Sequence, residues 1–380
     1  MRSKIVQDEM DGEDSPLSTT SLYCWWRSAS ESDDPPLSPP PSTGPSPRLK
    51  VVRELERLSL IAHESLDDLR HKLLCYRPGE FYLPTGGISR QDADVPPLLT
   101  ILLVGLESSG KSSLINLMYS VLGRSGLIPF TQTRRNPSNR GTICLEEHNV
   151  LRSSRNGFCV FDSRGLDPHR TAEGIREVEE WMEDGVRHRK PCWRREDGEG
   201  EEDLEPSIWF GSSRFATRRV NSVMVVADVA EIYRSWKAGN CGPLDSVGEL
   251  FHAHSVRKCN ETPILILTHG DELTPDERIE GRIKICNHLG VSELMGCYDI
   301  PCLNEHGLLV EEVDPITAYS ITEAVYRALL FGDRTHPPKR RPRDWVLYGL
   351  SVILCCFALV FEFLACVMGM LGNRKRKIKM

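Results

Sequence analysis

The stretch LLTILLVGLESSGKSSLINLMYSVL, from Leu98 to Leu122, limits the possible folds more than any other part of the chain. It begins with a wholly apolar run, Ile101 to Val104, which suits a strand buried on both faces. It ends with apolar residues repeated at helical spacing, from Leu114 to Leu122. A loop of small residues with one lysine lies between them. This order predicts an α/β fold with a mostly parallel sheet flanked by helices.

The loop fits the pattern Gly-x-x-x-x-Gly-Lys-Ser, from Gly105 to Ser112. The two glycines let successive backbone N–H groups converge on an anion, the lysine adds a positive charge, and the serine offers a hydroxyl to Mg²⁺. The helix that follows also favours negative charge at its N-terminus. The loop therefore predicts a P-loop that binds a nucleotide with Mg²⁺. Its predicted nucleotide contacts are Gly105, Ser108, Ser109, Gly110, Lys111, Ser112 and Ser113.

A second motif lies in GFCVFDSRGLDPHR, from Gly157 to Arg170. An apolar strand, Phe158 to Phe161, ends at Asp162, and Gly165 follows three residues later. In P-loop proteins, an aspartate at the end of a neighbouring strand helps to hold Mg²⁺. The sequence therefore predicts Asp162 as a metal residue, and Gly165 as a backbone donor to the terminal phosphate.

A threonine that closes over Mg²⁺ and the terminal phosphate usually precedes the strand that carries this aspartate. Thr142, in RGTICLEEHNV, stands at such a place and is predicted to have both a metal and a catalytic role. Thr131 and Thr133, in the basic loop FTQTRRNPSNR, are the alternatives.

A third motif, PILILTHGDEL, begins at Pro263. Its apolar strand ends at Thr268, His269, Gly270 and Asp271, where guanine-specific P-loop proteins carry Asn/Thr-Lys-x-Asp. Asp271 can accept hydrogen bonds from the guanine edge. His269 replaces the usual lysine and can still cover the base by stacking. Thr268, His269 and Asp271 complete the predicted nucleotide-binding set.

Three motifs in this order resemble those of TRAFAC-class GTPases, in the group that holds dynamins, septins, Toc-type and immunity-associated GTPases. The resemblance covers roughly residues 98 to 330. GLESSGKSS is similar to the dynamin loop and LTHGDEL to the Toc-type motif, while DSRGL also resembles interferon-induced GTPase-like proteins. The resemblance implies binding of GTP with Mg²⁺, a catalytic role for Ser108, and a homodimer across the nucleotide face.

Two departures from the family pattern affect the predicted activity. Leu166 stands where small GTPases place a water-orienting glutamine, so hydrolysis needs another group or a partner. The second base-contacting motif is not legible, and Asn304 is a guess for it. We therefore predict a slow GTPase that acts as a switch or assembly module. The alternatives are a nucleotide-binding scaffold with weak catalysis and a P-loop protein that prefers ATP.

Composition favours a cytosolic globular domain that does not bind nucleic acid. The formal net charge of −7 argues against a nucleic-acid partner. The 13 cysteines are scattered and lack paired zinc-ligand spacing, which is typical of reduced thiols.

The chain ahead of the P-loop divides into two parts. Residues 1–47 are rich in Ser, Pro and acidic residues, so we expect a disordered tail. Its Trp25 and Trp26 indicate either a loosely packed tail or a docking peptide for the domain or a partner. Residues 48–97 predict an amphipathic helix and an extended connector. The helix either packs against the domain or pairs with a second copy.

The P-loop domain is expected over residues 98–333, with a mobile insertion at about 170–218. The acidic run from Glu196 to Glu205 lies in this insertion and indicates a solvated loop.

The C-terminal part contains an apolar stretch of the length that crosses a bilayer, residues 345–372. A basic linker, 334–344, precedes it, and a basic tail, 373–380, follows it. A buried terminal helix is the alternative to a transmembrane anchor. The anchor predicts a single-pass tail-anchored protein with a cytosolic N-terminal domain. We expect the outer surface of a mitochondrion, plastid or peroxisome, or alternatively the endoplasmic reticulum.

Overall fold

A computed structural model of the chain describes residues 24–30, 45–84, 86–123, 142–151, 157–192, 215–259, 262–301, 313–334, 336–339 and 342–377. The chain divides into two compact units. The first consists of Met1–Phe81 and Pro96–Arg334, and the second of Tyr82–Val95 and Thr335–Met380.

The first unit is built on a six-stranded sheet with the order β2-β3-β1-β4-β5-β6. Its strands are β1 (Leu99–Gly105), β2 (Glu146–His148), β3 (Phe158–Asp162), β4 (Ser222–Asp228), β5 (Ile264–Thr268) and β6 (Cys297–Asp299). All neighbouring pairs are parallel except β2 and β3, which are antiparallel. In register, Ile101 of β1 lies opposite Val160 of β3 and Ser222 of β4. The predicted α/β fold with a mostly parallel sheet is confirmed.

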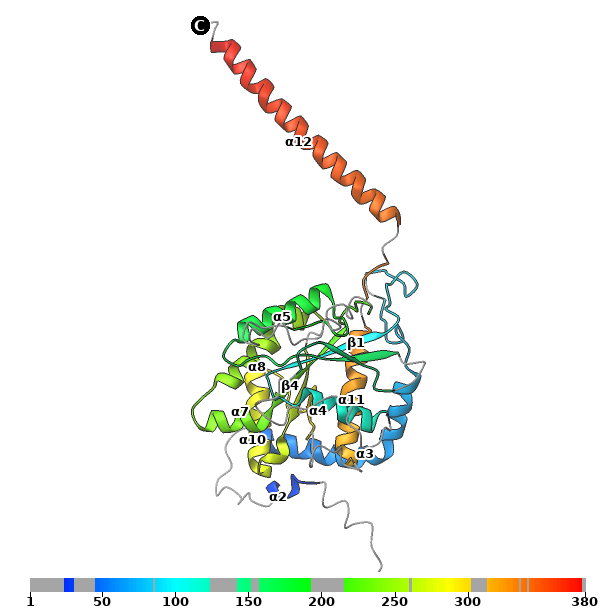
Figure 1. Cartoon of the computed structure of the whole chain (residues 1–380), viewed down its shortest axis with the longest axis vertical. Helices are drawn as coiled ribbons and strands as arrows, with labels where there is room; N and C mark the ends of the chain where they lie inside the picture. The colour runs from blue at the N-terminus through cyan, green and yellow to red at the C-terminus, as the bar shows by residue number, and fades with distance from the viewer. Residues whose placement is uncertain are drawn as a thin grey trace, which may run out of the picture. The chain divides into compact units, whose positions relative to one another are not determined.

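Helices cover both faces of the sheet. As a result, β1, β3 and β5 are buried along their whole length. Side chains of alternate strand positions enter opposite cores. Figure 1 shows the sheet with helices on its two sides. One core joins it to α3 (Pro47–Cys75), α4 (Lys111–Val121) and α11 (Pro315–Gly332). The other core joins it to α5 (Thr171–Asp184), α7 (Val229–Lys237), α8 (Gly242–His252), α9 (His254–Cys259) and α10 (Pro275–Leu289).

Helix α3 packs against the domain, chiefly along α11 and also against α10. Its N-terminus is fixed by Ser46, whose side chain accepts a hydrogen bond from the backbone N–H of Leu49. Its buried residues recur at helical spacing: Val51, Leu55, Leu58, Ala62, Leu69 and Leu73. Of the two alternatives for this helix, packing against its own domain is the one that the structure describes.

A short helix, α2 (Arg27–Ser30), lies within the segment expected to be a disordered tail. Cys24, Trp26 and Ala29 are buried in a cluster with α3 and with Ile279 of α10. The expectation of disorder is therefore wrong for residues 24–30, because their apolar side chains have a surface to cover. The rest of the tail, residues 1–23 and 31–44, lies outside the described residues.

The segment expected to be a mobile insertion, residues 170–218, begins with helix α5. Thr171, Gly174, Val178 and Trp181 of α5 are buried, and Val178 and Trp181 belong to the second core. This part of the expectation is wrong, because a helix with a buried face covers the sheet here. Residues 193–214, with the acidic run, lie outside the described residues.

The second unit pairs its two chain segments through backbone contacts. The backbone N–H of Asp94 donates to Pro337 O at 2.7 Å, and that of Lys339 donates to Asp92 O at 2.7 Å. The unit continues as α12 (Pro342–Lys377), a single long helix (Figure 1). Within α12, Val346–Ala365 is long and apolar enough to cross a membrane, with a mean hydropathy of 2.3.

Candidate nucleotide-binding site

The P-loop links the end of β1 to the start of α4. Gly105 closes β1 against β4, where an added Cβ would lie 2.2 Å from the carbonyl oxygen of Val226. Gly110 has φ 84° and precedes the first helical residue, Lys111. Both positions therefore require glycine, the first for close approach and the second for its left-handed backbone. Ser108 also has a left-handed backbone, with φ 59°, and its side chain is exposed at the loop.

Lys111 spans the loop that it follows. Its side chain is buried, and Nζ donates to Leu106 O at 2.8 Å, to Gly105 O at 3.2 Å and to Ser109 Oγ at 3.3 Å. The ammonium group is thus held inside the curve of the loop. A cation in this position favours an anion bound by the loop's N–H groups.

Three oxygen-bearing side chains meet beside the start of α4. Ser112 Oγ donates to Asp162 Oδ2 at 2.6 Å. Thr142 Oγ1 lies 3.3 Å from Ser112 Oγ and 3.4 Å from Asp162 Oδ2. The structure therefore brings together the three predicted metal residues, from α4, from the segment before β2 and from the end of β3.

Asp162 is fully buried, and its Oδ1 has no hydrogen-bond partner among the described residues. Burial raises the pKa of this carboxyl, and the hydrogen bond from Ser112 opposes that shift. A buried carboxylate oxygen without a partner is costly unless a cation lies beside it. Oxygen ligands from one carboxylate and two hydroxyls suit Mg²⁺, which takes its remaining ligands from phosphate and water. These residues fit the ion.

Gly165 lies against the P-loop, where an added Cβ would come within 2.5 Å of Glu107 Cα. The next residue, Leu166, pairs with the loop: its N–H donates to Gly105 O at 3.0 Å, and its carbonyl accepts from Glu107 N–H at 2.8 Å. Its side chain is fully buried and contacts Gly174 of α5, where an added Cβ would lie 2.6 Å from Leu166 Cγ. Leu166 is therefore a core residue and does not orient water.

The third motif follows β5 and touches the P-loop. Thr268 is fully buried, and its Oγ1 donates to Ser109 O at 2.8 Å. His269 has φ 55°, and its ring lies near Gly110, where an added Cβ would be 3.4 Å from His269 Cε1. Asp271 is exposed in the short turn η4 (Gly270–Glu272). The β5 turn and the P-loop therefore form one continuous surface.

His269 has a partner that sequence reasoning missed. Its Nδ1 lies 2.9 Å from Asp228 Oδ2 at the end of β4. The carboxylate of Asp228 at this distance raises the pKa of His269, and burial opposes the shift. Asp228 Oδ1 also accepts from the N–H of Glu231 and caps α7. The signal was present, because Asp228 directly follows an apolar strand whose carboxyl end meets those of β1 and β5.

The other predicted residues have different outcomes. Ser109 is buried and Ser113 is half-buried next to Ser112. Thr131, Thr133 and Asn304 lie outside the described residues, so no comparison with Thr142 is drawn from the structure.

The fold and the site together define an α/β protein with a phosphate-binding loop. A scan against protein-family models and a search of curated proteins find no match. Solved structures similar to this chain include Toc33 from Arabidopsis thaliana in complex with GDP and Mg²⁺. That match has 14% identity and a TM-score of 0.33, and it covers 68% of this chain and 93% of Toc33.

Two further structures belong to the same set. One comes from work described as showing that dimerization is important for the GTPase activity of the chloroplast translocon components atToc33 and psToc159. That match has 14% identity and a TM-score of 0.33, and it covers 72% of this chain and 94% of the other. The other is the signal recognition particle receptor SRb-GTP/SRX complex from Chaetomium thermophilum. That match has 13% identity and a TM-score of 0.29, and it covers 55% of this chain and 93% of the other. With identities and TM-scores this low, the function must be inferred from the site itself.

Proposed function

We propose that the protein binds GTP with Mg²⁺ and acts as a slow GTPase switch or assembly module on a membrane. The observation that carries this proposal is the oxygen cluster of the buried Asp162 with the half-buried Ser112 and Thr142 beside a P-loop. One Asp162 oxygen in this cluster lacks a hydrogen-bond partner among the described residues. Such an arrangement is suited to a cation bound with a phosphate chain.

Each residue of the phosphate site has a distinct role. The loop from Gly105 to Gly110 supplies backbone N–H groups, and Lys111 holds positive charge at the outer phosphates. Ser112, Asp162 and Thr142 would hold Mg²⁺ through their oxygens. When bound, the ion neutralises charge on the phosphate oxygens. Gly165 directs its N–H to the terminal phosphate.

Guanine preference is assigned to the turn after β5. The exposed Asp271 accepts from the base edge, and His269 covers the base in place of lysine. The contact of His269 with Asp228 orients the imidazole, and the hydrogen bond from Thr268 to Ser109 fixes the turn against the P-loop. These contacts support a base site directly beside the phosphate site.

Hydrolysis, in this proposal, depends on a second copy of the chain. Leu166 is buried, whereas Ser108 is exposed with a left-handed backbone at the P-loop. An exposed hydroxyl at this place can act across a homodimer formed over the nucleotide face. Helix α12 supplies the membrane attachment, as a tail anchor on a mitochondrial, plastid or peroxisomal outer surface or, alternatively, on the endoplasmic reticulum.

The binding part of the proposal is tested on the full-length chain in detergent, with labelled GTP and ATP in Mg²⁺ or in EDTA. We expect GTP to bind more tightly than ATP, and Mg²⁺ to tighten GTP binding. Ser112→Ala and Asp162→Asn should lose the effect of Mg²⁺. The matched control is Ser255→Ala, which removes a buried serine hydroxyl on α9 that has no hydrogen-bond partner among the described residues. Preference for ATP would refute the guanine assignment.

A second candidate function is a nucleotide-binding scaffold without useful turnover, and the burial of Leu166 favours it. Single-turnover hydrolysis at increasing protein concentration separates the two. A rate that rises with concentration and is lost in Ser108→Ala supports the GTPase. A rate that never exceeds that of GTP in buffer supports the scaffold.

A further inference from the structure

The segment of residues 24–30 is fastened to the domain by polar contacts as well as apolar ones. Trp26 is only 1% exposed, and its Nε1 donates to Glu56 Oε1 on α3 at 2.9 Å. Arg27 pairs with the two oxygens of the same carboxylate, at 3.0 and 3.1 Å. Arg48 of α3 donates to Ala29 O at 2.7 Å. The segment therefore packs in a defined position against α3 and α10.

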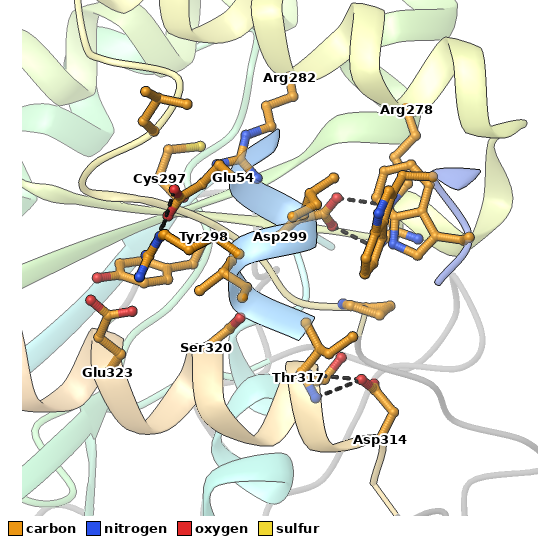
Figure 2. A pocket seen from close by; sticks show the side chains of 18 of the residues that line it. Glu54, Arg278, Arg282, Cys297, Tyr298, Asp299, Asp314, Thr317, Ser320 and Glu323 are labelled. Carbon is orange, nitrogen blue, oxygen red and sulfur yellow. Dashed lines mark hydrogen bonds and ion pairs between the residues drawn. The ribbon is translucent and has the colours of Figure 1, made fainter. Parts of the chain in front are cut away.

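Trp25 connects this segment to the buried ion pair of Arg278 and Asp299. Its ring lies under the guanidinium of Arg278, 3.9 Å from the ring centroid, and packs edge-on against Trp26. Arg278 of α10 makes two hydrogen bonds to Asp299 at the end of β6, at 2.7 and 2.8 Å. Figure 2 shows Arg278 and Asp299 joined by these hydrogen bonds at the side of a pocket. The pocket has a volume of about 330 Å³, and its lining residues include Trp25 and Trp26. The arginine and aspartate side chains are 7% and 4% exposed, so the pair is well desolvated.

The ion pair lies directly behind the turn assigned to guanine. A Cβ added at Gly270 would come within 2.5 Å of Arg278 Nε and 3.0 Å of Asp299 Oδ1. Gly270 stands between His269 and Asp271, the two residues that we assign to the base. Contacts therefore run without a gap from Trp25 through Arg278 to the backbone of this turn.

We propose that Trp25 and Arg278 are positioning residues for the nucleotide site, and that docking of residues 24–30 slows nucleotide release. This inference rests on the proposed function for its nucleotide readout. While Trp25 covers Arg278, the guanidinium is held flat against Asp299 and supports Gly270. When the segment leaves, Arg278 loses one face of its packing, and the turn after β5 becomes looser.

The test uses the full-length chain in detergent with two readouts. The first is amide hydrogen exchange of the turn from His269 to Leu273 in nucleotide-free protein. The second is the dissociation rate of a fluorescent GDP analogue. Trp25→Ala should speed exchange in this turn and raise the dissociation rate about threefold to tenfold, a range typical of losing one cation–π contact. Trp25→Phe, which keeps an aromatic face, should restore most of both properties.

The matched control is Trp236→Ala. Trp236 lies 4.8 Å from Lys284 Nζ, so this variant also removes an aromatic ring from a cation of α10. The three atoms nearest to Gly270 belong to Arg278 and Asp299, not to Lys284. Hydrogen exchange in the turn and the dissociation rate of GDP should therefore stay at their wild-type values. Arg278→Lys, which keeps the charge but loses the paired hydrogen bonds, should reproduce the effect of Trp25→Ala.

Two outcomes would overturn the inference. The first is wild-type exchange in the turn of Trp25→Ala. The second is faster exchange in the turn with an unchanged GDP dissociation rate. If the wild-type chain binds no guanine nucleotide, the proposed function fails, and the exchange measurement still decides whether Trp25 supports the turn.

Discussion

The hydrogen bond from Thr268 to Ser109 offers a direct test of the contact between the β5 turn and the P-loop. Thr268→Val keeps the shape of the side chain and removes only its hydroxyl, which also makes a longer hydrogen bond to Ala227 O at 3.2 Å. The bond is 2.8 Å long, and its two residues are 0% and 1% exposed. Losing a buried hydrogen bond costs about 1–2 kcal/mol of unfolding free energy. For a domain of this size, that corresponds to a fall in Tm of about 2–8 °C.

Thr100→Val is the matched control, because Thr100 is equally buried in β1, a central strand of the same sheet. Its hydroxyl has a weaker partner, the thiol of Cys159 at 3.6 Å. We expect this variant to lose less than half as much stability as Thr268→Val. Thermal unfolding of the full-length proteins in detergent measures both, and GDP titration should show weaker binding only for Thr268→Val. Equal losses of stability in the two variants would refute the reasoning.

Three further predictions concern other parts of the chain. The pKa of His269 is raised above its ordinary value of about 6.5. The ion pair of His269 with Asp228 therefore adds its full stability below about pH 6.5, and this stability is lost as the pH rises through the raised pKa. Asp228→Asn, which keeps an oxygen to cap α7, should therefore lower Tm at pH 6 and not at pH 9; an equal loss at both would contradict the pairing. Deleting residues 345–380 should give a chain that no longer pellets with membranes and still binds nucleotide, whereas the full-length chain should resist alkaline extraction. Replacing the basic residues of the tail by serine should redirect a tagged chain to the endoplasmic reticulum without releasing it, as imaging and fractionation would show; the residues are Arg374, Lys375, Arg376, Lys377 and Lys379.

The central strands and the proximity of Ser112, Thr142 and Asp162 were predictable because their signals are local. The short apolar runs of the three motifs became buried parallel strands, and the polar residues at their ends, such as Asp162 and Thr268, lie at the same edge of the sheet. The edge strands β2 and β6 have three residues each, too few for a periodic pattern. They form because neighbouring strands offer free backbone groups, which a local pattern does not record.

The sequence analysis missed two kinds of feature. The first is helix α5, which was expected to be part of a mobile insertion, and the second is contacts between residues far apart in the chain. Helix α5 has buried Gly174, Val178 and Trp181 at helical spacing. It was included in the predicted insertion because it lies between the second and third motifs, in the same segment as the acidic run. The contact of Asp228 with His269 joins two strands, and that of Trp25 with Arg278 joins the ends of a long stretch of chain. The sequence left docking of the tryptophans open as one of two alternatives, since the docking surface exists only after α3 and α10 have packed.

The backbone pairing of Leu166 with the P-loop sets the direction in which a change at the phosphates would travel. Gly165 and Leu166 are adjacent, so pulling one toward a phosphate moves the other. The Leu166 side chain rests on Gly174, where no larger residue would fit without displacing it. We therefore expect a displacement of Gly165 to reach helix α5 through the side chain of Leu166.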